Sequence, residues 1–303
     1  MNLSQQKNRR GAALMLSLWA LFLLSATVIA WALEIDARMS LSGTASRVVE
    51  AEAMASSGAE VALDPAVNAG SSVLHGSLGR NQTYQAQITG EGGRLNLNWI
   101  VAGEDPQRLE ILRKYLENKG VDLNERDRMI DCLLDWVGPN TGLRHLNGAT
   151  DSEDYHPSHT LLKQIDELKK VKGWEQFTTR PDWDEDFTLY STGPIDLVWA
   201  SRYVLLSLPG MSEGLVDRFL QLRRGPDNID GTADDLQFKS LDELRLALGF
   251  SPEQFKQLAT LVGFNDRVVR VVSVGKSGEA TRVVQMIVRK TEVMPQMIKW
   301  EEL

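Results

Sequence analysis

The chain has 303 residues, a formal net charge of −8 and 43% hydrophobic residues, so it is long enough for two domains and apolar enough to build real cores. Its acidic balance and its lack of basic clusters beyond the extreme N-terminus argue against a phosphate-binding surface, so we expect no nucleic-acid partner. The single cysteine, Cys132, excludes an intrachain disulfide and a cysteine metal site. It lies in a helical pattern and is expected to be a buried thiol without a functional role.

An uncharged segment runs from Gly11 to Leu33, directly after the basic residues Lys7, Arg9 and Arg10. At the rise of an α-helix this segment reaches about 34 Å, enough to cross the apolar part of a bilayer. Basic residues stay on the cytoplasmic side, so the rest of the chain is expected outside the cytoplasm. The segment is too long for the core of an ordinary secretory signal, so by length alone it is a signal anchor.

The helical pattern continues beyond this segment. Glu34, Asp36 and Arg38 mark the membrane interface, and apolar residues recur at helical spacing after them, at Ile35, Met39, Val49 and Ala53. Residues 51–59 are mostly Ala, Ser and Gly, whose small side chains allow close approach to a sheet or to other helices. We therefore predict one stem helix with a membrane half and an amphipathic half.

Two pairs of strands are predicted on either side of a helical region. In the first pair, 82–89 and 94–99 alternate polar and apolar residues around the turn 90–93. In the second pair, 267–274 and 281–289 are rich in Val and Ile and flank the turn 275–278. The simplest architecture is one four-stranded sheet packed on the stem helix. The largely helical region 104–264 is then inserted between the second and third strands.

The helical region contains an internal repeat. The sequence from Ile165 to Leu168 leads to a Gly-aromatic pair at Gly173, and the sequence from Leu241 to Leu244 leads to one at Gly249 with the same spacing. Each is predicted to be a short helix stopped by glycine. In each half another helix and an acidic loop precede it, the helices being 124–137 and 212–223. Ser240 with Glu243 and Ser251 with Gln254 have the spacing of capping boxes.

The second acidic loop, from Asp227 to Asp235, holds six oxygen-bearing side chains and a glycine in nine positions. Calcium prefers several hard oxygen ligands from a flexible loop, so we expect a calcium ion bound by Asp227, Asp230, Asp234 and Asp235. The spacing is not that of an EF-hand. The alternative is a solvated turn held by hydrogen bonds of its Asp and Asn side chains.

The first acidic loop, with Asp151, Glu153 and Asp154, could hold a second calcium ion, but a solvated loop is the favoured interpretation. Enzymatic patterns do not stand out: the four histidines form no HExxH array, and no serine lies in a nucleophile elbow. His156 and His159 are expected in a surface loop because Pro157 separates them. A Pro-Gly turn at 208–211 resembles that of a DNA-binding helical hairpin, but its acidic surroundings favour a structural turn.

Several short motifs follow one another in the order found in type II secretion protein K. They are Leu95-Asn96-Leu97-Asn98-Trp99, Leu133-Leu134-Asp135-Trp136, Asn147-Gly148-Ala149, Asp166-Glu167-Leu168 and Leu208-Pro209-Gly210. The basic leader that ends at Gly11 resembles the signal of type IV pilins and type II secretion pseudopilins. Most such subunits carry glutamate at the fifth mature position, where this chain has Leu16. The absence of this glutamate is a trait of the protein K family.

The resemblance implies an α+β fold, in which a pilin-like N-terminal stem helix packs on a small antiparallel sheet. A large, duplicated all-α insertion, similar to a sterile alpha motif, lies between strands. The expected organisation is a prepilin leader at 1–11, the transmembrane half of the stem at 12–33, the amphipathic stem with the first strand pair at 34–103, the inserted domain at 104–264 and the second strand pair at 265–303. Prepilin peptidase would cut between Gly11 and Ala12, and the new N-terminus would be methylated.

The resemblance further implies a non-enzymatic minor pseudopilin at the tip of the pseudopilus, which helps to initiate and cap the filament used for protein export. The expected partners are the minor pseudopilins I and J and the inner-membrane secretion platform. The protein would be a single-pass inner-membrane protein with its globular part in the periplasm, and calcium would bind in the insertion. The alternative is a membrane-tethered binding module that uses the insertion to hold DNA or a secreted substrate.

Overall fold

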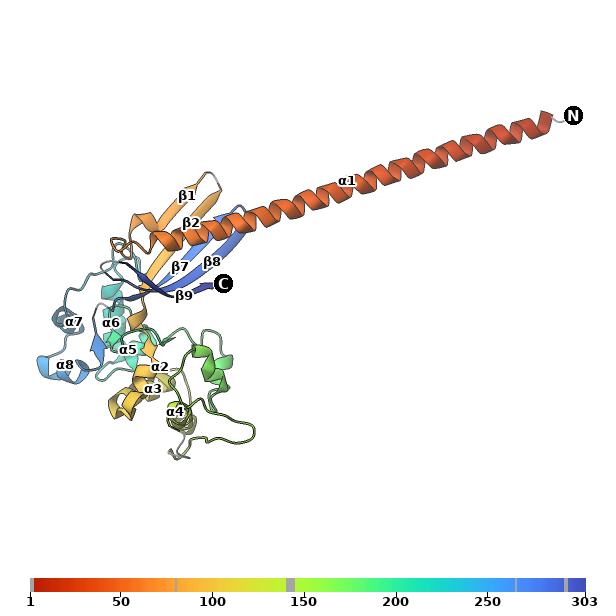
Figure 1. The fold of residues 1–303 in the computed structure, drawn as a ribbon. Helices are drawn as coiled ribbons and strands as arrows, with labels where there is room; N and C mark the ends of the chain where they lie inside the picture. Colours follow the sequence, from red (N-terminus) through yellow and green to blue (C-terminus); the bar gives the residue numbers. More distant parts are fainter. Residues whose placement is uncertain (1–2, 80, 140–144, 265, 292–293) are drawn as a thin grey trace.

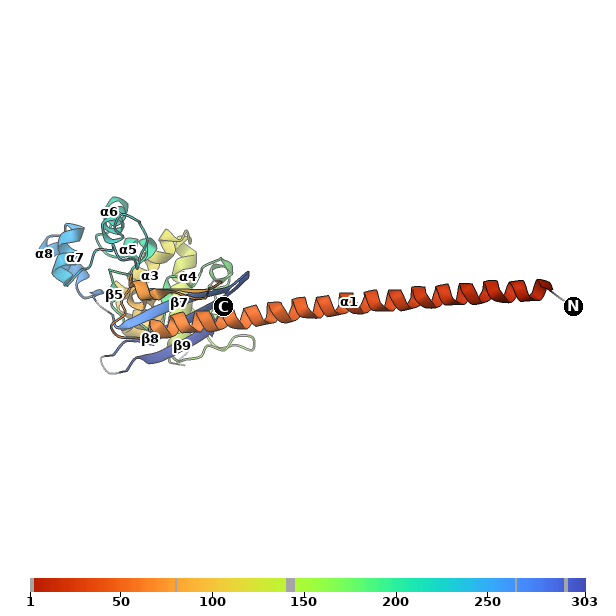
Figure 2. The same ribbon diagram turned by 90° about the horizontal axis from the view of Figure 1, so that it is seen from above.

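The computed structural model describes residues 3–79, 81–139, 145–264, 266–291 and 294–303. One continuous helix, α1 (Leu3–Val61), forms a rod whose N-terminal part projects far beyond the rest of the chain (Figures 1 and 2). Its C-terminal part is buried through Ala51, Ala55 and Ala59. The predicted stem helix, which leaves the apolar segment without interruption, is therefore confirmed.

A five-stranded antiparallel sheet lies against this end of α1. Its strands are β1 (His75–Leu78), β2 (Gln82–Gly90), β7 (Val268–Ser277), β8 (Ala280–Arg289) and β9 (Gln296–Glu302), and their order is β1-β2-β7-β8-β9. Three of the predicted strands, 82–89, 267–274 and 281–289, lie in this sheet. The two edge strands, β1 and β9, extend it beyond the four strands that the sequence predicts.

The predicted strand 94–99 is wrong. Only β3 (Leu95–Asn96) is extended, and it pairs in parallel with β4 (Phe187–Thr188), outside the main sheet. The chain then turns into helix α2 (Leu97–Val101), because the side chain of Asn96 accepts a hydrogen bond from the Trp99 N–H and caps the helix. The alternation of Leu95, Leu97 and Trp99 therefore reflects a buried strand-to-helix junction and not a continued strand.

Small residues bring α1 close to the sheet. Ala55 and Ala59 pack with Val271, Val284 and Met286 in a core between helix and strands. A Cβ atom at Gly275 of β7 would lie only 2.0 Å from the carbonyl oxygen of Ala51, so backbone meets backbone at this point. The predicted role of the Ala, Ser and Gly stretch in close packing against a sheet is confirmed.

The residues between β2 and β7 in the sequence form a second body with its own core, which includes Tyr115, Trp174, Phe187 and Phe219. Its helices after α2 are α3 (Pro106–Asn118), α4 (Leu123–Val137), α5 (Arg202–Leu206), α6 (Glu213–Arg223), α7 (Leu241–Leu248) and α8 (Pro252–Leu258). A two-residue parallel pair, β5 (Ile195–Asp196) with β6 (Val262–Gly263), ties the start of α5 to the end of α8. Figure 1 shows this body at the end of the sheet, away from the free end of α1.

The description of this body as largely helical is wrong between α4 and α5. The described residues there form loops, two-residue strands and two 3-10 helices, η4 (Ile165–Lys170) and η5 (Phe177–Thr179). Pro157, Pro181 and Pro194 remove backbone donors that a helix would need. The first copy of the repeat is thus the 3-10 helix η4, whereas the second is α7, which ends at Gly249 in the left-handed conformation.

The capping predictions are largely confirmed. Ser251 and Gln254 form a complete capping box at the start of α8. Ser240 accepts from the Glu243 N–H, while the Glu243 carboxylate accepts from the Lys239 N–H instead of from the cap residue.

Candidate functional site

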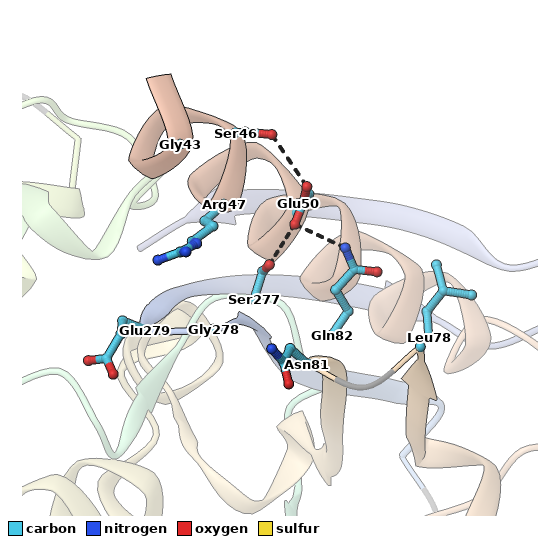
Figure 3. A pocket seen from close by; sticks show the side chains of 11 residues that line it. Gly43, Ser46, Arg47, Glu50, Leu78, Asn81, Gln82, Ser277, Gly278 and Glu279 are labelled. Carbon is cyan, nitrogen blue, oxygen red and sulfur yellow. Dashed lines mark hydrogen bonds between the residues drawn. The ribbon is translucent and has the colours of Figure 1, made fainter. Parts of the chain in front are cut away.

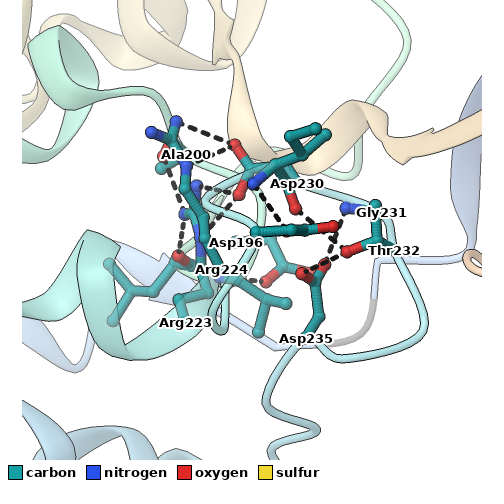
Figure 4. Close-up of polar contacts among 12 residues, drawn as sticks. Asp196, Ala200, Arg223, Arg224, Asp230, Gly231, Thr232 and Asp235 are labelled. Carbon is teal, nitrogen blue, oxygen red and sulfur yellow. Dashed lines mark hydrogen bonds and ion pairs between the residues drawn. The ribbon is translucent and has the colours of Figure 1, made fainter.

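The acidic loop after α6 brings three predicted ligands together, and Figure 4 shows one of them, Asp235, beside Gly231 and Thr232. Asp227, Asp234 and Asp235 each place a carboxylate oxygen within 4.8 Å of the others. The Thr232 hydroxyl lies 2.8 Å from Asp234 Oδ1 and 3.2 Å from Asp235 Oδ1. The Gly231 N–H donates to Asp235 Oδ2 at 2.6 Å. The loop therefore holds three carboxylates close to one another, two of them exposed and that of Asp235 partly buried.

The chemistry of this cluster suits a hard divalent cation. The hydrogen bond from Thr232 holds the pKa of Asp234 below its usual range, whereas burial raises the pKa of Asp235. Converging carboxylates repel one another, and an ion with several oxygen ligands relieves that repulsion. In the part of the chain that the structure describes, this is the one group of at least three such side chains with metal-binding geometry. Its donors fit calcium.

Asp230, the fourth predicted ligand, lies apart from the other three. Its carboxylate accepts from Arg223 Nη2 at 2.7 Å and pairs with Arg224 Nη2 at 2.9 Å (Figure 4). Arg223 is only 2% exposed and also donates to the carbonyl oxygens of Leu197 and Ala200. Asp230 therefore anchors the loop to the helical body as the partner of a buried arginine.

The same loop touches the sheet. Gln87 Nε2 of β2 donates to the Asp230 carbonyl oxygen at 3.0 Å. Gly70, in the segment after α1, lies against the backbone of Thr232 and Ala233, where a Cβ atom would come within 2.6 Å, and its φ of 77° also favours glycine. The acidic loop thus lies at the joint between the helical body and the sheet, so an ion that orders the loop would stiffen this joint.

The first acidic loop has a different arrangement. Asp151 pairs with His159 Nε2 at 3.2 Å and with His156 Nδ1 at 3.5 Å, and the hydrogen bond with His159 lowers the pKa of Asp151. Glu153 and Asp154 are exposed in an adjoining turn. The structure does not gather these three carboxylates, and Asp151 faces the two histidines. The predicted loop conformation around Pro157 is confirmed.

A polar contact of His145 was not predicted from the sequence. Its Nδ1 lies 2.6 Å from the buried carboxylate of Asp135, and its Nε2 lies 3.3 Å from Glu104. The three residues lie far apart in the sequence, so no local spacing signals them. Cys132 on the same helix as Asp135 is buried, as predicted, and burial raises its thiol pKa to about 11.

A polar cleft of about 730 Å³ lies where α1 leaves the sheet (Figure 3). Glu50 of α1 accepts from the Ser277 hydroxyl at 2.6 Å and from Gln82 Nε2 at 2.9 Å. These hydrogen bonds, the one from Ser277 above all, hold the pKa of Glu50 below its usual range. Glu50 therefore fixes the stem to β2 and β7 at the point where the docked part of the helix begins.

The predicted processing site, Gly11 and Ala12, lies within α1, ahead of its most apolar part. Among the described residues, one helical segment, Ala12–Val61, contains a stretch long and apolar enough to cross a membrane. Large apolar side chains along it, such as Leu16, Trp19 and Phe22, are exposed. This is the pattern of a surface that faces lipid.

Comparison with known proteins bears on these features. Residues 93–180 match the family model described as type II secretion system (T2SS), protein K. The resemblance to type II secretion system protein K is confirmed. All the motifs that carry it, except Leu208-Pro209-Gly210, lie within this segment. None of the curated protein sequences compared with the chain matches it.

The fold is also similar to that of a solved structure. A chain in the crystal structure of the GspK–GspI–GspJ complex from the type 2 secretion system of enterotoxigenic Escherichia coli is similar, with a TM-score of 0.58 and 13% sequence identity. The similarity covers 89% of this chain and 98% of that chain. At this identity the two proteins share a fold, and the likeness extends well beyond the segment that matches the protein K model.

The protein K motifs hold the helical body together. Asn98 donates to the Leu162 carbonyl oxygen and accepts from the Leu162 N–H, so it clamps a distant loop from both sides. Asn96 caps α2 and donates to the Ser191 carbonyl oxygen. A Cβ atom at Gly148 would lie only 1.9 Å from Asp135 Oδ2, so any larger residue there would have to displace the Asp135 carboxylate. In the described residues these motif side chains serve packing and capping.

Proposed function

We propose that this chain is a minor pseudopilin of a type II secretion system. The observation that carries the proposal is the packing of a long, half-free N-terminal helix on an antiparallel sheet, in a chain whose residues 93–180 match protein K. Its role is structural: it contributes surfaces and no catalytic groups. The exposed apolar half of α1 supports a single-pass inner-membrane anchor, with the sheet and helical body in the periplasm.

The tip of the pseudopilus is the position that suits the chain. The helical body between β2 and β7 adds bulk that a subunit enclosed between neighbours could not accommodate. The neutral Leu16 at the fifth mature position also lacks the charge that would pair with the N-terminus of a subunit above it. At the tip the chain would help to start and cap the filament, on the inner-membrane platform and together with the pseudopilins I and J. The similar crystal structure is a complex of GspK with GspI and GspJ, which supports these partners.

Co-purification tests this function. The full-length chain, extracted from membranes with its sister pseudopilins, should bring down I and J in a fixed ratio. A chain that isolates alone under conditions in which I and J bind each other would refute the scaffold. Retention of a secreted substrate or of DNA instead would establish the second candidate, a membrane-tethered receptor that uses the helical body.

Processing of the leader is tested separately. Co-expression with prepilin peptidase should remove residues 1–11 and leave a methylated Ala12, as read by mass spectrometry. Gly11→Val should remain full length because the enzyme is expected to require the glycine. Gly43→Val, which lies on the same helix with open space around it, should be processed normally. A wild-type chain that stays uncut in the presence of an active peptidase would refute the proposal of a pilin-type leader.

We further propose that calcium binds at Asp227, Asp234 and Asp235 and stabilises the joint between helical body and sheet. A fragment that starts near Val48 should gain thermal stability when calcium is added, and Asp234→Ala with Asp235→Ala should abolish that gain. Glu110→Ala with Glu117→Ala makes the same change in charge on α3 and should preserve it. An equal response in both variants would mean that calcium acts elsewhere.

A further inference from the structure

A short turn in the first acidic loop places Asp151 beside His156. The backbones of Ser152 and Tyr155 bond to each other in both directions, at 2.9 Å and 3.3 Å, and form an antiparallel bridge. Residues 151 and 156 flank this bridge on opposite sides of the turn, and the side chains of such opposed residues point to the same face. Asp151 Oδ1 accordingly lies 3.5 Å from His156 Nδ1. The turn thus holds a carboxylate and an imidazole next to each other.

The turn is anchored on the end of α4. Tyr155 is buried, and the centroid of its ring lies 5.8 Å from that of Trp136, the penultimate residue of α4. Pro157 is buried as well. Two residues further on, the His159 N–H donates to the Trp136 carbonyl oxygen at 2.8 Å. The backbone is therefore held against the helical body on both sides of His156.

The hydrogen bonds of His159 decide which of its nitrogens faces Asp151. Its Nδ1 lies 2.9 Å from the Gly138 carbonyl oxygen, which can only accept, so Nδ1 carries a hydrogen. Its Nε2 lies 3.2 Å from Asp151 Oδ2. In the neutral ring Nε2 then presents a lone pair, and a lone pair that faces a carboxylate is unfavourable. The gap between Nε2 and Oδ2 is therefore a place for a positive charge, either a proton or a metal ion.

The spacing and the donor atoms of these groups suit a transition metal. Zinc binds imidazole nitrogen and carboxylate oxygen at about 2.0–2.2 Å, so two ligands of a tetrahedral site lie about 3.3 Å apart. The distance of 3.2 Å between His159 Nε2 and Asp151 Oδ2 matches this value, and the 3.5 Å to His156 comes close to it. A histidine ligand typically donates its other N–H to an acceptor such as a carbonyl oxygen, as His159 does to Gly138. Two imidazole nitrogens favour zinc over calcium, which prefers oxygen ligands.

We propose that Asp151, His156 and His159 bind a divalent transition metal ion, of which zinc is the best fit. His159 and Asp151 already stand at ligand spacing. His156 contacts the other carboxylate oxygen, and its side chain is 74% exposed, so a rotation of this side chain completes the set. Water takes the fourth position, as in other zinc sites with three protein ligands. The ion locks the turn onto the end of α4, at a place separate from the calcium site proposed in the second acidic loop, and it does not depend on the proposed function.

Titration of the full-length chain with zinc tests the site. The protein, in detergent, is stripped of metal by a chelator that is then removed, supplied with excess calcium and titrated by calorimetry at pH 8, where free imidazole is neutral. We expect wild type to bind zinc and His156→Ala to bind it at least tenfold more weakly. Because His156 is exposed, the melting temperature of this variant without zinc should stay within a few degrees of wild type. Equal affinity in the two proteins would overturn the inference, and so would the absence of binding to wild type, since the gap would then hold only a proton.

Further variants separate the site from other histidines and carboxylates. His159→Asn should weaken zinc binding at least tenfold, since asparagine tolerates the positive φ of 49° at this position but lacks the nitrogen that faces Asp151. His75→Ala on β1, and Asp234→Ala with Asp235→Ala in the second acidic loop, should leave the zinc affinity unchanged. X-ray absorption of the zinc-loaded protein should show two imidazole ligands at about 2.0–2.1 Å. A shell of oxygen ligands alone would refute the site.

Discussion

At the scale of single residues, the stability of the fold depends most clearly on one buried carboxylate. Glu91, directly after β2, is fully buried and accepts from Arg270 Nε at 3.0 Å, Arg94 Nη1 at 3.1 Å and the Thr188 hydroxyl at 2.6 Å. Burial disfavours its charged form, but the two arginines and Thr188 outweigh this effect and hold its pKa below the ordinary value of 4.5. Because Arg270 lies on β7 and Thr188 in the helical body, Glu91 joins the two halves of the molecule.

Replacement of Glu91 by glutamine should lower the free energy of unfolding by about 3 kcal/mol, since it leaves two partly buried guanidinium groups without a charged partner. Urea denaturation of the chain from Val48 onward measures this loss. Glu110→Gln, which removes a carboxylate from an exposed pair with Arg113, should cost less than about 1 kcal/mol. Equal losses in the two variants would contradict the special role of Glu91.

The depressed pKa of Glu91 also predicts that the stability of the protein depends on pH. A depressed pKa stabilises the folded state above the unfolded pKa, and this stabilisation disappears as the pH falls through the folded pKa, below 4.5. The difference in unfolding free energy between wild type and Glu91→Gln should therefore be largest near neutral pH and should shrink below about pH 4. A difference that stays constant from pH 7 to pH 3 would show that charge is not its cause.

The sequence predicts part of the acidic site at this scale. Asp227, Asp234 and Asp235 are found together because loop composition is local information. The diversion of Asp230 to Arg223 depends on how α6 packs against Leu197 and Ala200, which no spacing reveals. The partners of His145 and Glu50 are equally distant in the sequence and become visible only in the fold.

At the scale of elements, the contact between α1 and β7 leaves the least room for a larger side chain. Gly275→Val should separate helix and strand, because a side chain there collides with the backbone of Ala51 and Ala55. We expect a loss of about 3 kcal/mol, at the upper end for overpacking, measured as a lower melting temperature of the chain from Val48 onward. Gly214→Ala, in the first turn of α6 with no atom within 4 Å of the new methyl, should be neutral or slightly stabilising. A stable Gly275→Val protein would mean that the helix can shift on the sheet.

Helices and strands were predictable where one hydrophobic period, helical or alternating, dominates the sequence. The stem, α4, α6 and the β7–β8 hairpin each carry a long and consistent pattern. Alternation over six residues was not enough at 94–99, where an Asn cap converts the pattern into a helix. The edge strands β1 and β9 were not predicted because they are short or mix charges with apolar residues, as exposed edges do.

At the scale of the whole molecule, the proposed tip position predicts that the chain is present in very small numbers. Quantitative mass spectrometry of sheared pseudopili should find about one copy of this chain for each filament, and its overproduction should raise the number of filaments without entering their shafts. Deletion of residues 104–264 would remove the helical body, whose bulk in our proposal keeps the chain out of the filament shaft. Incorporation of the intact chain at regular intervals along the shaft would contradict the steric argument.

The hydrogen bonds of Glu50 have a mechanical consequence. About 36 residues of α1 between Ala12 and Arg47 form a free arm of about 54 Å, while the docked part from Val48 to Val61 measures about 21 Å. The molecule is thus a lever whose pivot lies near Glu50, and a sideways load at the membrane end acts on the docked part with a leverage of about 2.5. Tight seating of Gly275 against the helix and the polar clamp at the pivot are the features that such a lever needs to transmit a push without bending at its hinge.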